Sequence, residues 1–408
     1  MNIKIIKEDK KEPIYEFVER KGKGHPDTLS DNLAEYLSRQ YSKYTLEKFG
    51  FILHHNFDKV GLLGGASEVG FGYGKLIKPI RVLLNGRAST KFGDEKIDVK
   101  NLLINWSREF LVNNLPIVEP DQELEFHYNL STQSSPGKTE EEDNKNKSSK
   151  KNWFEPRGLE DLQEVRFLFS NDTSMGVGFA PYTKLESLIL EIETTLNGDI
   201  FKKNNLWMGS DIKIMGFRYK DDFEITLCIP QIGKYVHSLD EYKRNILFAK
   251  KYIENIFNKN KIKKNKIYIN TRDNYEKGEL YLTAIGSSIE SGDEGLVGRG
   301  NRVQGLISPT RLMSMEGVAG KNPVYHIGKV YYVVAQKISD EIYKEFSITN
   351  EVALISQSGR DLFDPWVVFI HVQKSSIGDV KIKNIVKKII KEIPNTTNDI
   401  INGEIMIC

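Results

Sequence analysis

Two hydrophobic periodicities alternate along the chain, and this alternation limits the fold more than any other feature. An apolar stripe of about 3.6 residues per turn covers residues 28–49 and ends at Gly50, which predicts an amphipathic helix. Similar stripes predict helices at 185–196, 239–256, 323–345 and 381–393. Short β-rich runs separate them, at 51–56, 80–85, 165–170, 211–217, 224–229, 279–286 and 367–372. The order predicts an α+β fold of mixed sheets covered by helices.

The chain is long enough for several structural units. Its 408 residues correspond to roughly three domains of about 150 residues each. We place a first α+β subdomain at 14–136, a second at 152–275 and a third at 276–408, and subdomains that are discontinuous in sequence stay an open alternative. Residues 137–151 contain no large apolar side chain, so a disordered charged loop is predicted there. We expect the three subdomains to be similar, because the strand and helix order recurs.

Charge and composition exclude several classes of protein. The 58 Lys and Arg residues nearly balance the 56 Asp and Glu residues, so neither nucleic acid nor a membrane surface is expected as a partner. The apolar runs are shorter than the ~18 residues needed to span a bilayer. Without a secretory signal at the start, a cytoplasmic location is expected. Cys228 and Cys408 fit no disulfide or thiolate metal pattern, and the lysine-rich run at 258–266 is typical of a solvated helix end.

The segment ERKGKGHPD at 19–27 is the first candidate for chemistry. Gly22 and Gly24 would let the backbone approach a ligand, and the helix start at Pro26 favours an anion such as phosphate. Asp27 and Asp31 are one turn apart, and their oxygens suit Mg²⁺. An alternative stays open, since an aspartate before a helix is often only an N-cap.

Two later segments add phosphate-oriented donors. SGDEGLVGRGNRVQGL at 291–306 can wrap an anion with its arginines. It lacks the spacing of a dinucleotide-binding fingerprint, and no P-loop is present in the chain. MSMEGVAGKNPVYHIGK at 313–329 contributes Lys321 as a phosphate contact. With no nucleophile elbow or kinase signature, this inventory indicates a polyphosphate held by charge and metal.

The combined motifs resemble the S-adenosylmethionine synthetase family, specifically its archaeal type. Besides the three segments above, FILHHNFDKV at 51–60, NDTSMGVGFAP at 171–181 and INTRDNYEKGELYLT at 269–283 follow in family order. The resemblance implies a homodimer or higher oligomer of chains with three similar subdomains, whose active sites lie between subunits. It implies that ATP and L-methionine are the substrates, that Mg²⁺ is required and that K⁺ often activates.

The resemblance also implies a reaction. Methionine sulfur attacks C5′ of ATP, and the released tripolyphosphate is hydrolysed to phosphate and pyrophosphate. A thioether sulfur needs no general base, so positioning and charge would do most of the work.

Matching positions give expected roles for single residues. His25, Arg299 and Lys321 would contact the triphosphate as catalytic residues, with Asp27 and Asp31 at the metal. Asp293 would bind the methionine ammonium and Arg302 a phosphate. Further candidates for substrate binding are Glu19, Asp58, Asp172 and Asn301.

One segment departs from the family pattern. A gate over the site would fall near YNLSTQSSPGK at 128–138, where Gln133 keeps part of the role. Two alternatives stay open, and only the first follows from this departure. The first is a specialised relative that adenosylates another thioether amino acid, and the second is an ATP-binding regulatory subunit without turnover.

Overall fold

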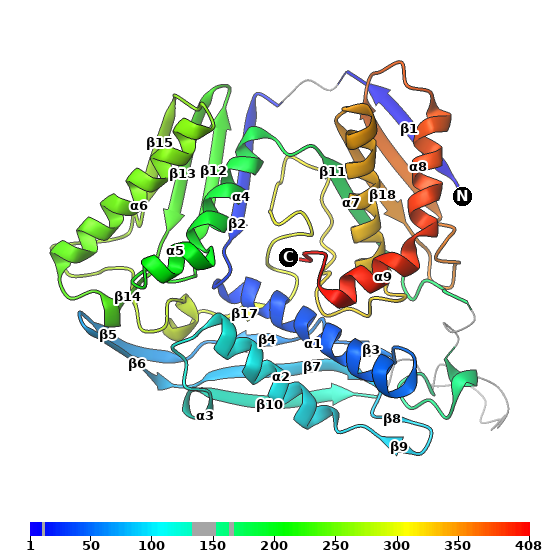
Figure 1. Ribbon diagram of the computed structural model, residues 1–408, viewed down its shortest axis with the longest axis horizontal. Helices are drawn as coiled ribbons and strands as arrows, with labels where there is room; N and C mark the ends of the chain where they lie inside the picture. The colour runs from blue at the N-terminus through cyan, green and yellow to red at the C-terminus, as the bar shows by residue number, and fades with distance from the viewer. Residues whose placement is uncertain (10–12, 133–151, 163–166) are drawn as a thin grey trace.

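Three β-sheets, each packed against helices, form the body of the protein (Figure 1). The computed structural model describes residues 1–9, 13–132, 152–162 and 167–408. The predicted loop at 137–151 and the candidate Gln133 lie outside these residues. The sheets combine parallel and antiparallel strand pairs. The predicted α+β class is confirmed.

The helix α1 (Pro26–Phe49) carries the first candidate motif at its start. The ring of His25 caps the helix, because Nδ1 accepts a hydrogen bond of 3.2 Å from the Asp27 N–H. Pro26 occupies the first turn, where no N–H is required. Gly50 ends the helix in the left-handed region at φ 82°. The helix predicted at 28–49 is confirmed, and its buried stripe includes Leu29, Leu33 and Leu37.

The first sheet has the strand order β10 (Leu124–Ser131), β7 (Ile80–Ala88), β4 (Gly61–Leu63) and β17 (Gly295–Leu296), with β3 (His55–Asn56) also paired to β7. The helices α1 and α2 (Val99–Asn114) share its hydrophobic core. The sequence analysis missed α2. Ser107 occupies one of its buried positions between Leu103 and Phe110, which interrupts the apolar stripe.

The second sheet has the order β15 (Asn265–Ile269), β13 (Asp222–Cys228), β12 (Lys213–Tyr219) and β2 (Tyr15–Lys21). The helices α4 (Lys184–Leu196) and α6 (Leu239–Lys259) pack against it. Both were predicted, and both begin with side-chain caps, from Thr183 and Ser238.

The third sheet joins the two ends of the chain. Its order is β1 (Ile3–Glu8), β19 (Val367–Gln373), β18 (Asn350–Ile355) and β11 (Met175–Ala180). The helix α7 (Ile327–Phe346) packs along this sheet with α8 (Asp379–Lys391) and α9 (Ile393–Asn402) nearby. The helix predicted at 323–345 corresponds to α7, which starts later, at Ile327. The helix predicted at 381–393 corresponds to α8, which is followed directly by α9.

The three sheets draw strands from across the subdomain ranges expected from the sequence. The strand β2 falls in the range 14–136 but pairs with β12, so that Phe17 lies opposite Phe217. Likewise β11 pairs with β18, and β17 pairs with β4. The periodicity of a strand gives no information about its hydrogen-bonding partner. The sequence could therefore not show that each sheet combines strands from more than one of the expected subdomain ranges.

The remaining α-helices and β-strands of the described residues are short. They are β5 (Ala66–Gly70), β6 (Tyr73–Lys78), β8 (Lys91–Phe92), β9 (Glu95–Lys96), α3 (Pro120–Glu123), α5 (Asp199–Asn204), β14 (Gln231–Ile232) and β16 (Leu282–Thr283). The β-rich runs at 51–56 and 279–286 thus contain only two-residue strands. Every helix among the described residues is too short or too polar to span a bilayer.

Candidate functional site

The glycines before α1 pack against a neighbouring segment of the backbone. The Gly22 N–H donates to the Ile212 carbonyl at 2.8 Å, and the Gly24 N–H donates to the Ser210 carbonyl at 3.0 Å. A Cβ atom on Gly24 would clash with Ser210, and one on Gly22 would clash with the Ile212 carbonyl. The two glycines therefore hold the turn against residues 210–212, whereas the sequence analysis assigned them to ligand approach.

A loop that follows β17 folds over the start of α1. Asp31 accepts hydrogen bonds from the backbone N–H groups of Gly298 at 2.7 Å and Gly300 at 3.0 Å, one on each carboxylate oxygen. Asp27 accepts one from the Leu296 N–H at 3.1 Å. A Cβ atom on Gly300 would clash with the Asp31 carboxylate. The two acids share a helix face as predicted, and both hold this loop.

Lys21 connects the loop to the strand β2. Its Nζ lies 2.8 Å from Asp27 Oδ2 and 2.6 Å from the Arg299 carbonyl oxygen. The buried Asn301 side chain accepts from the Lys21 N–H at 3.0 Å and donates to the Lys21 carbonyl at 2.8 Å. Asn301 thus ties loop to strand. The Arg299 side chain is 69% exposed, and its Nε is 3.8 Å from Asp27 Oδ1, so the guanidinium is available to a ligand.

Arg302 joins this loop to the segment that carries Lys321. Its guanidinium donates to the carbonyl oxygens of Gly298 at 2.7 Å and Glu316 at 3.3 Å. The Glu316 carboxylate in turn forms an ion pair with Lys321 and accepts from the Ser174 hydroxyl. The two phosphate-oriented segments therefore form one continuous network.

Lys321 is buried among charged neighbours. Burial lowers the pKa of its ammonium to about 8, against the attraction of Asp58 and Asp172, which raises it. The lysine backbone is fixed, because the Ser38 hydroxyl donates to the Lys321 carbonyl at 3.0 Å. Glu35 of α1 accepts from the Gly320 N–H at 3.1 Å. Asp58 and Asp172 thus lie close enough to Lys321 for their charges to act on it.

The remaining candidates are His25, Asp293 and Glu19, and they have different surroundings. Burial lowers the pKa of the His25 imidazole, and the charge of Asp211 opposes this shift. Asp293 is exposed, and its Oδ2 lies 3.1 Å from the Ser288 hydroxyl. Glu19 forms an ion pair of 3.1 Å with Lys213 across β2 and β12. Its place in the middle of a strand separates it from the α1 terminus.

A metal ion would find few free ligands here. Within the described ranges, no group of three or more His, Cys, Asp or Glu side chains is arranged to hold one. Both Asp31 oxygens already accept backbone hydrogen bonds, and burial raises the Asp31 pKa to about 7. These bonds argue against Asp31 as a ligand. Asp27 fits only as a single carboxylate ligand of a metal ion that the phosphates of the substrate also bind.

Four residues of the network were missed by the sequence analysis. Lys21 and Glu316 stood inside the quoted motifs, where their charges were the available signal. Asp211 and Ser288 carried no motif signal, because they reach the site only through contacts between distant segments.

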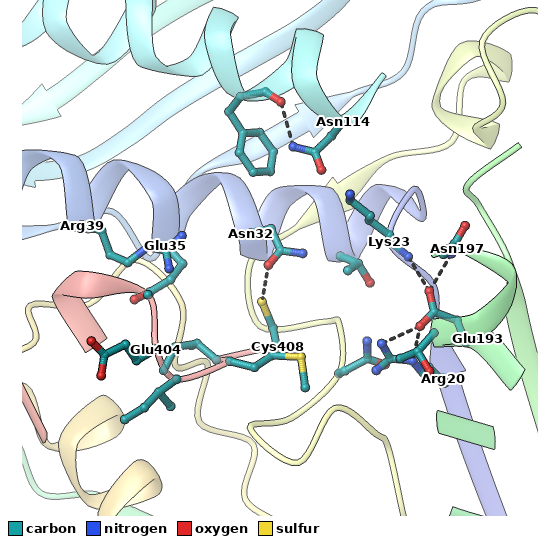
Figure 2. Close-up of a pocket in the computed structure, with 18 residues that line it drawn as sticks. Arg20, Lys23, Asn32, Glu35, Arg39, Asn114, Glu193, Asn197, Glu404 and Cys408 are labelled. Carbon is teal, nitrogen blue, oxygen red and sulfur yellow. Dashed lines mark hydrogen bonds and ion pairs between the residues drawn. The ribbon is translucent and has the colours of Figure 1, made fainter. Parts of the chain in front are cut away.

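A cleft lies along another face of α1 (Figure 2). It has a volume of ≈ 570 Å³, and its wall includes Asn32, Glu35 and Arg39 of α1 opposite residues 403–408. The Asn32 side chain accepts from the Cys408 thiol at 3.1 Å. Asn301 lines this cleft, but His25, Arg299 and Lys321 do not. The cleft is therefore separate from the candidate phosphate-binding residues.

Known proteins resemble this chain over nearly its full length. The family model for S-adenosylmethionine synthetase matches residues 2–153 and 154–404. The S-adenosylmethionine synthase of Thermoplasma acidophilum is 39% identical over 96% of this chain and 95% of its own length. The probable S-adenosylmethionine synthase of Aquifex aeolicus is 38% identical over 96% of each chain.

A solved structure described as an unusual S-adenosylmethionine synthetase from Campylobacter jejuni shares the fold. Its TM-score is 0.62 at 15% identity, over 94% of this chain and 88% of that one. The resemblance seen in the motifs is confirmed over nearly the full length, and archaeal proteins are among the relatives. The chain belongs to the S-adenosylmethionine synthetase family.

Proposed function

We propose that the protein makes S-adenosylmethionine from ATP and L-methionine, with the sulfur displacing tripolyphosphate from C5′. The observation that carries this proposal is the chain of contacts that links His25, Asp27, Arg299, Arg302 and Lys321 through Lys21 and Glu316. Basic groups linked in this way suit a leaving group that gains negative charge as the C–O bond breaks. No base is required, because the thioether sulfur has a free lone pair.

Each part of the network has a task in this proposal. Arg299 and Lys321 bind phosphate oxygens, and Arg302 keeps their two segments at a fixed separation. His25 donates to an oxygen near the scissile bond, and Asp293 binds the methionine ammonium. The same donors then hold the tripolyphosphate during its hydrolysis.

Members of the family generally need metal ions. We assign Mg²⁺ here, carried by the phosphates and held on the protein by Asp27, with K⁺ as an activator. Bound Mg²⁺ would neutralise charge on the phosphate oxygens. Asp27 would exchange its contact with Lys21 for the metal, which would release the lysine ammonium toward the phosphates.

The proposed assembly is a homodimer, formed through the open face of the second sheet. Tyr15, Phe17, Met215 and Tyr219 are all at least 43% exposed there. The strand register places them side by side on β2 and β12, and an exposed apolar face of this kind is typical of an association surface. Phe17→Asp should yield monomers in analytical ultracentrifugation. The proposed location of the enzyme is the cytoplasm.

The deciding experiment is incubation with ATP, methionine and Mg²⁺, followed by mass spectrometry of the sulfonium product. Product together with phosphate and pyrophosphate is expected. A substrate panel of other thioether amino acids tests the specialised relative, for which methionine would be a poor competitor. Tight ATP binding without any product would instead indicate the regulatory subunit and contradict the proposal.

A further inference from the structure

A buried carboxylate outside the predicted site residues lies beside both His25 and the Asp293 region. Asp211 lies two residues before the start of β12 and is 2% exposed. Its Oδ2 accepts three hydrogen bonds, from the Ser288 N–H at 2.9 Å, the Ser288 hydroxyl at 2.6 Å and the Tyr281 hydroxyl at 3.2 Å. Three donors on one oxygen stabilise a carboxylate that burial alone would disfavour.

The Ser288 hydroxyl lies between two carboxylates. Its oxygen is 2.6 Å from Asp211 Oδ2 and 3.1 Å from Asp293 Oδ2. A hydroxyl has a single hydrogen to donate, and the shorter contact assigns that hydrogen to Asp211. Ser288 Oγ and Asp293 Oδ2 are then two acceptors in contact with no hydrogen between them, and an unmatched pair of this kind favours a ligand that brings donors.

We infer that Asp211 is a positioning residue for the amino-acid substrate. By taking the Ser288 hydrogen, it turns the lone pairs of Ser288 Oγ and the carboxylate of Asp293 toward one point, where the substrate ammonium binds. This inference rests on the proposed function and adds two residues, Asp211 and Ser288, to the amino-acid part of the site. An ammonium supplies three donors, and these acceptors satisfy two of them.

The same segment connects the amino-acid end of the site to the phosphate end. The Gly24 N–H donates to the Ser210 carbonyl at 3.0 Å, and the Ser287 hydroxyl donates to the Gly24 carbonyl at 2.6 Å. Burial raises the pKa of Asp211, and the charge of His25 and the hydrogen bonds from Ser288 and Tyr281 oppose this shift. Residues 210–212 and 286–288 therefore enclose the turn that precedes His25.

Asp211→Asn tests the inference, because it keeps the size of the side chain and removes its charge. The KM for methionine should rise on the order of 10- to 100-fold, while the KM for ATP stays within about twofold, since one charged hydrogen-bond acceptor is lost. Ser288→Ala should act in the same direction. The methionine KM of the double variant should be no higher than that of Asp211→Asn alone, because Asp211 acts only through Ser288.

Asp273→Asn is the matched control. Asp273 also contacts Tyr281, accepting from its N–H at 3.0 Å, and it accepts from the Tyr242 hydroxyl at 2.7 Å. No hydrogen bond among the described residues joins it to Ser288. Its replacement should lower the melting temperature and leave the methionine KM within about twofold of the wild-type value.

Three outcomes would overturn the inference. They are an unchanged methionine KM in Ser288→Ala, equal rises of both KM values in Asp211→Asn, and fully additive effects in the double variant. If Asp211→Asn does not fold, Ser288→Ala and Tyr281→Phe decide by the same criteria. A wild-type enzyme that makes no product would instead refute the proposed function, so the two failures are distinguishable.

Discussion

Arg299 and Lys321 are both assigned to phosphate, yet their surroundings are opposite. The Arg299 side chain is 69% exposed and that of Lys321 only 5% exposed. The Lys321 side chain itself is held, by its ion pair with Glu316. For Arg299 only the backbone of the loop is held, by hydrogen bonds to Asp31. Lys321 is thus preorganised for charge that develops in the reaction, and Arg299 must lose side-chain entropy when ligand binds.

Replacing Lys321 should have the largest effect. Lys321→Met is expected to lower kcat by roughly 10²- to 10³-fold, as for loss of one preorganised donor. Initial rates at saturating ATP and methionine measure this. Lys59→Met is the control, because Lys59 carries the same charge on a side chain that is 68% exposed. Equal losses of kcat in the two variants would contradict the prediction, because they would show that any nearby positive charge contributes as much as the buried Lys321.

Arg299→Ala should act mainly on binding. We expect a rise in the KM for ATP of about 10-fold, the loss of one charge-assisted contact. The melting temperature should not change, because the nearest carboxylate is 3.8 Å from its Nε. Steady-state kinetics and a thermal melt test both statements. A drop in kcat as large as that of Lys321→Met would remove the contrast between the two residues.

The pH dependence should distinguish the two basic groups. The Lys321 pKa of about 8 means that the phosphate-binding ammonium is present below pH 8 and lost above it. We therefore expect kcat/KM for ATP to fall about 10-fold between pH 7 and pH 9. Lys321→Arg should flatten this fall, since arginine stays charged.

The fold should respond to pH in the opposite direction. Burial disfavours the charged Lys321, so the unfolded chain, with a pKa near its ordinary 10.5, binds more protons between pH 8 and 10.5. The free energy of unfolding should gain a contribution from Lys321 as pH rises through that window. Denaturant titrations of wild type and Lys321→Met would show the difference, and identical pH profiles would contradict it.

Asn301→Ala should have the smallest effect on activity. It removes both side-chain bonds between the loop and Lys21, which should cost about 1–3 kcal/mol of stability and reduce kcat/KM a few-fold. A urea melt and kinetics measure these changes. Asn129→Ala is the control, because that exposed side chain bonds only to Asn85 among the described residues. Unchanged stability of Asn301→Ala would show that the loop is held by Asp31 alone.

Much of the fold could be predicted from local pattern. The α1 stripe, its cap and its terminating Gly50 all appear in consecutive residues, and the structure confirms them. The pairing of β2 with β12, or of β1 with β19, could not be predicted in the same way. Strand partners are chosen by packing between distant segments, and one sequence carries no record of that choice.

Candidate site residues could be named where charge and glycine share a motif. Arg299, Arg302 and Lys321 were chosen for this reason, and Arg302 and Glu316 link the segments that carry them. Asp31 shows the limit, because a carboxylate suited to a metal is equally suited to backbone N–H groups, and here it accepts two. Asp211 has no motif of its own and gains its surroundings only when β12 approaches residues 286–288.

The parallel pairing of β1 with β19 bears on how the protein is made. The ribosome synthesises β1 long before its partner β19. In the same way, β4 of the first sheet is synthesised long before its partner β17. Nascent chains would therefore carry unpaired edges for most of their synthesis, a state that invites chaperone binding. Final assembly would come late and nearly all at once.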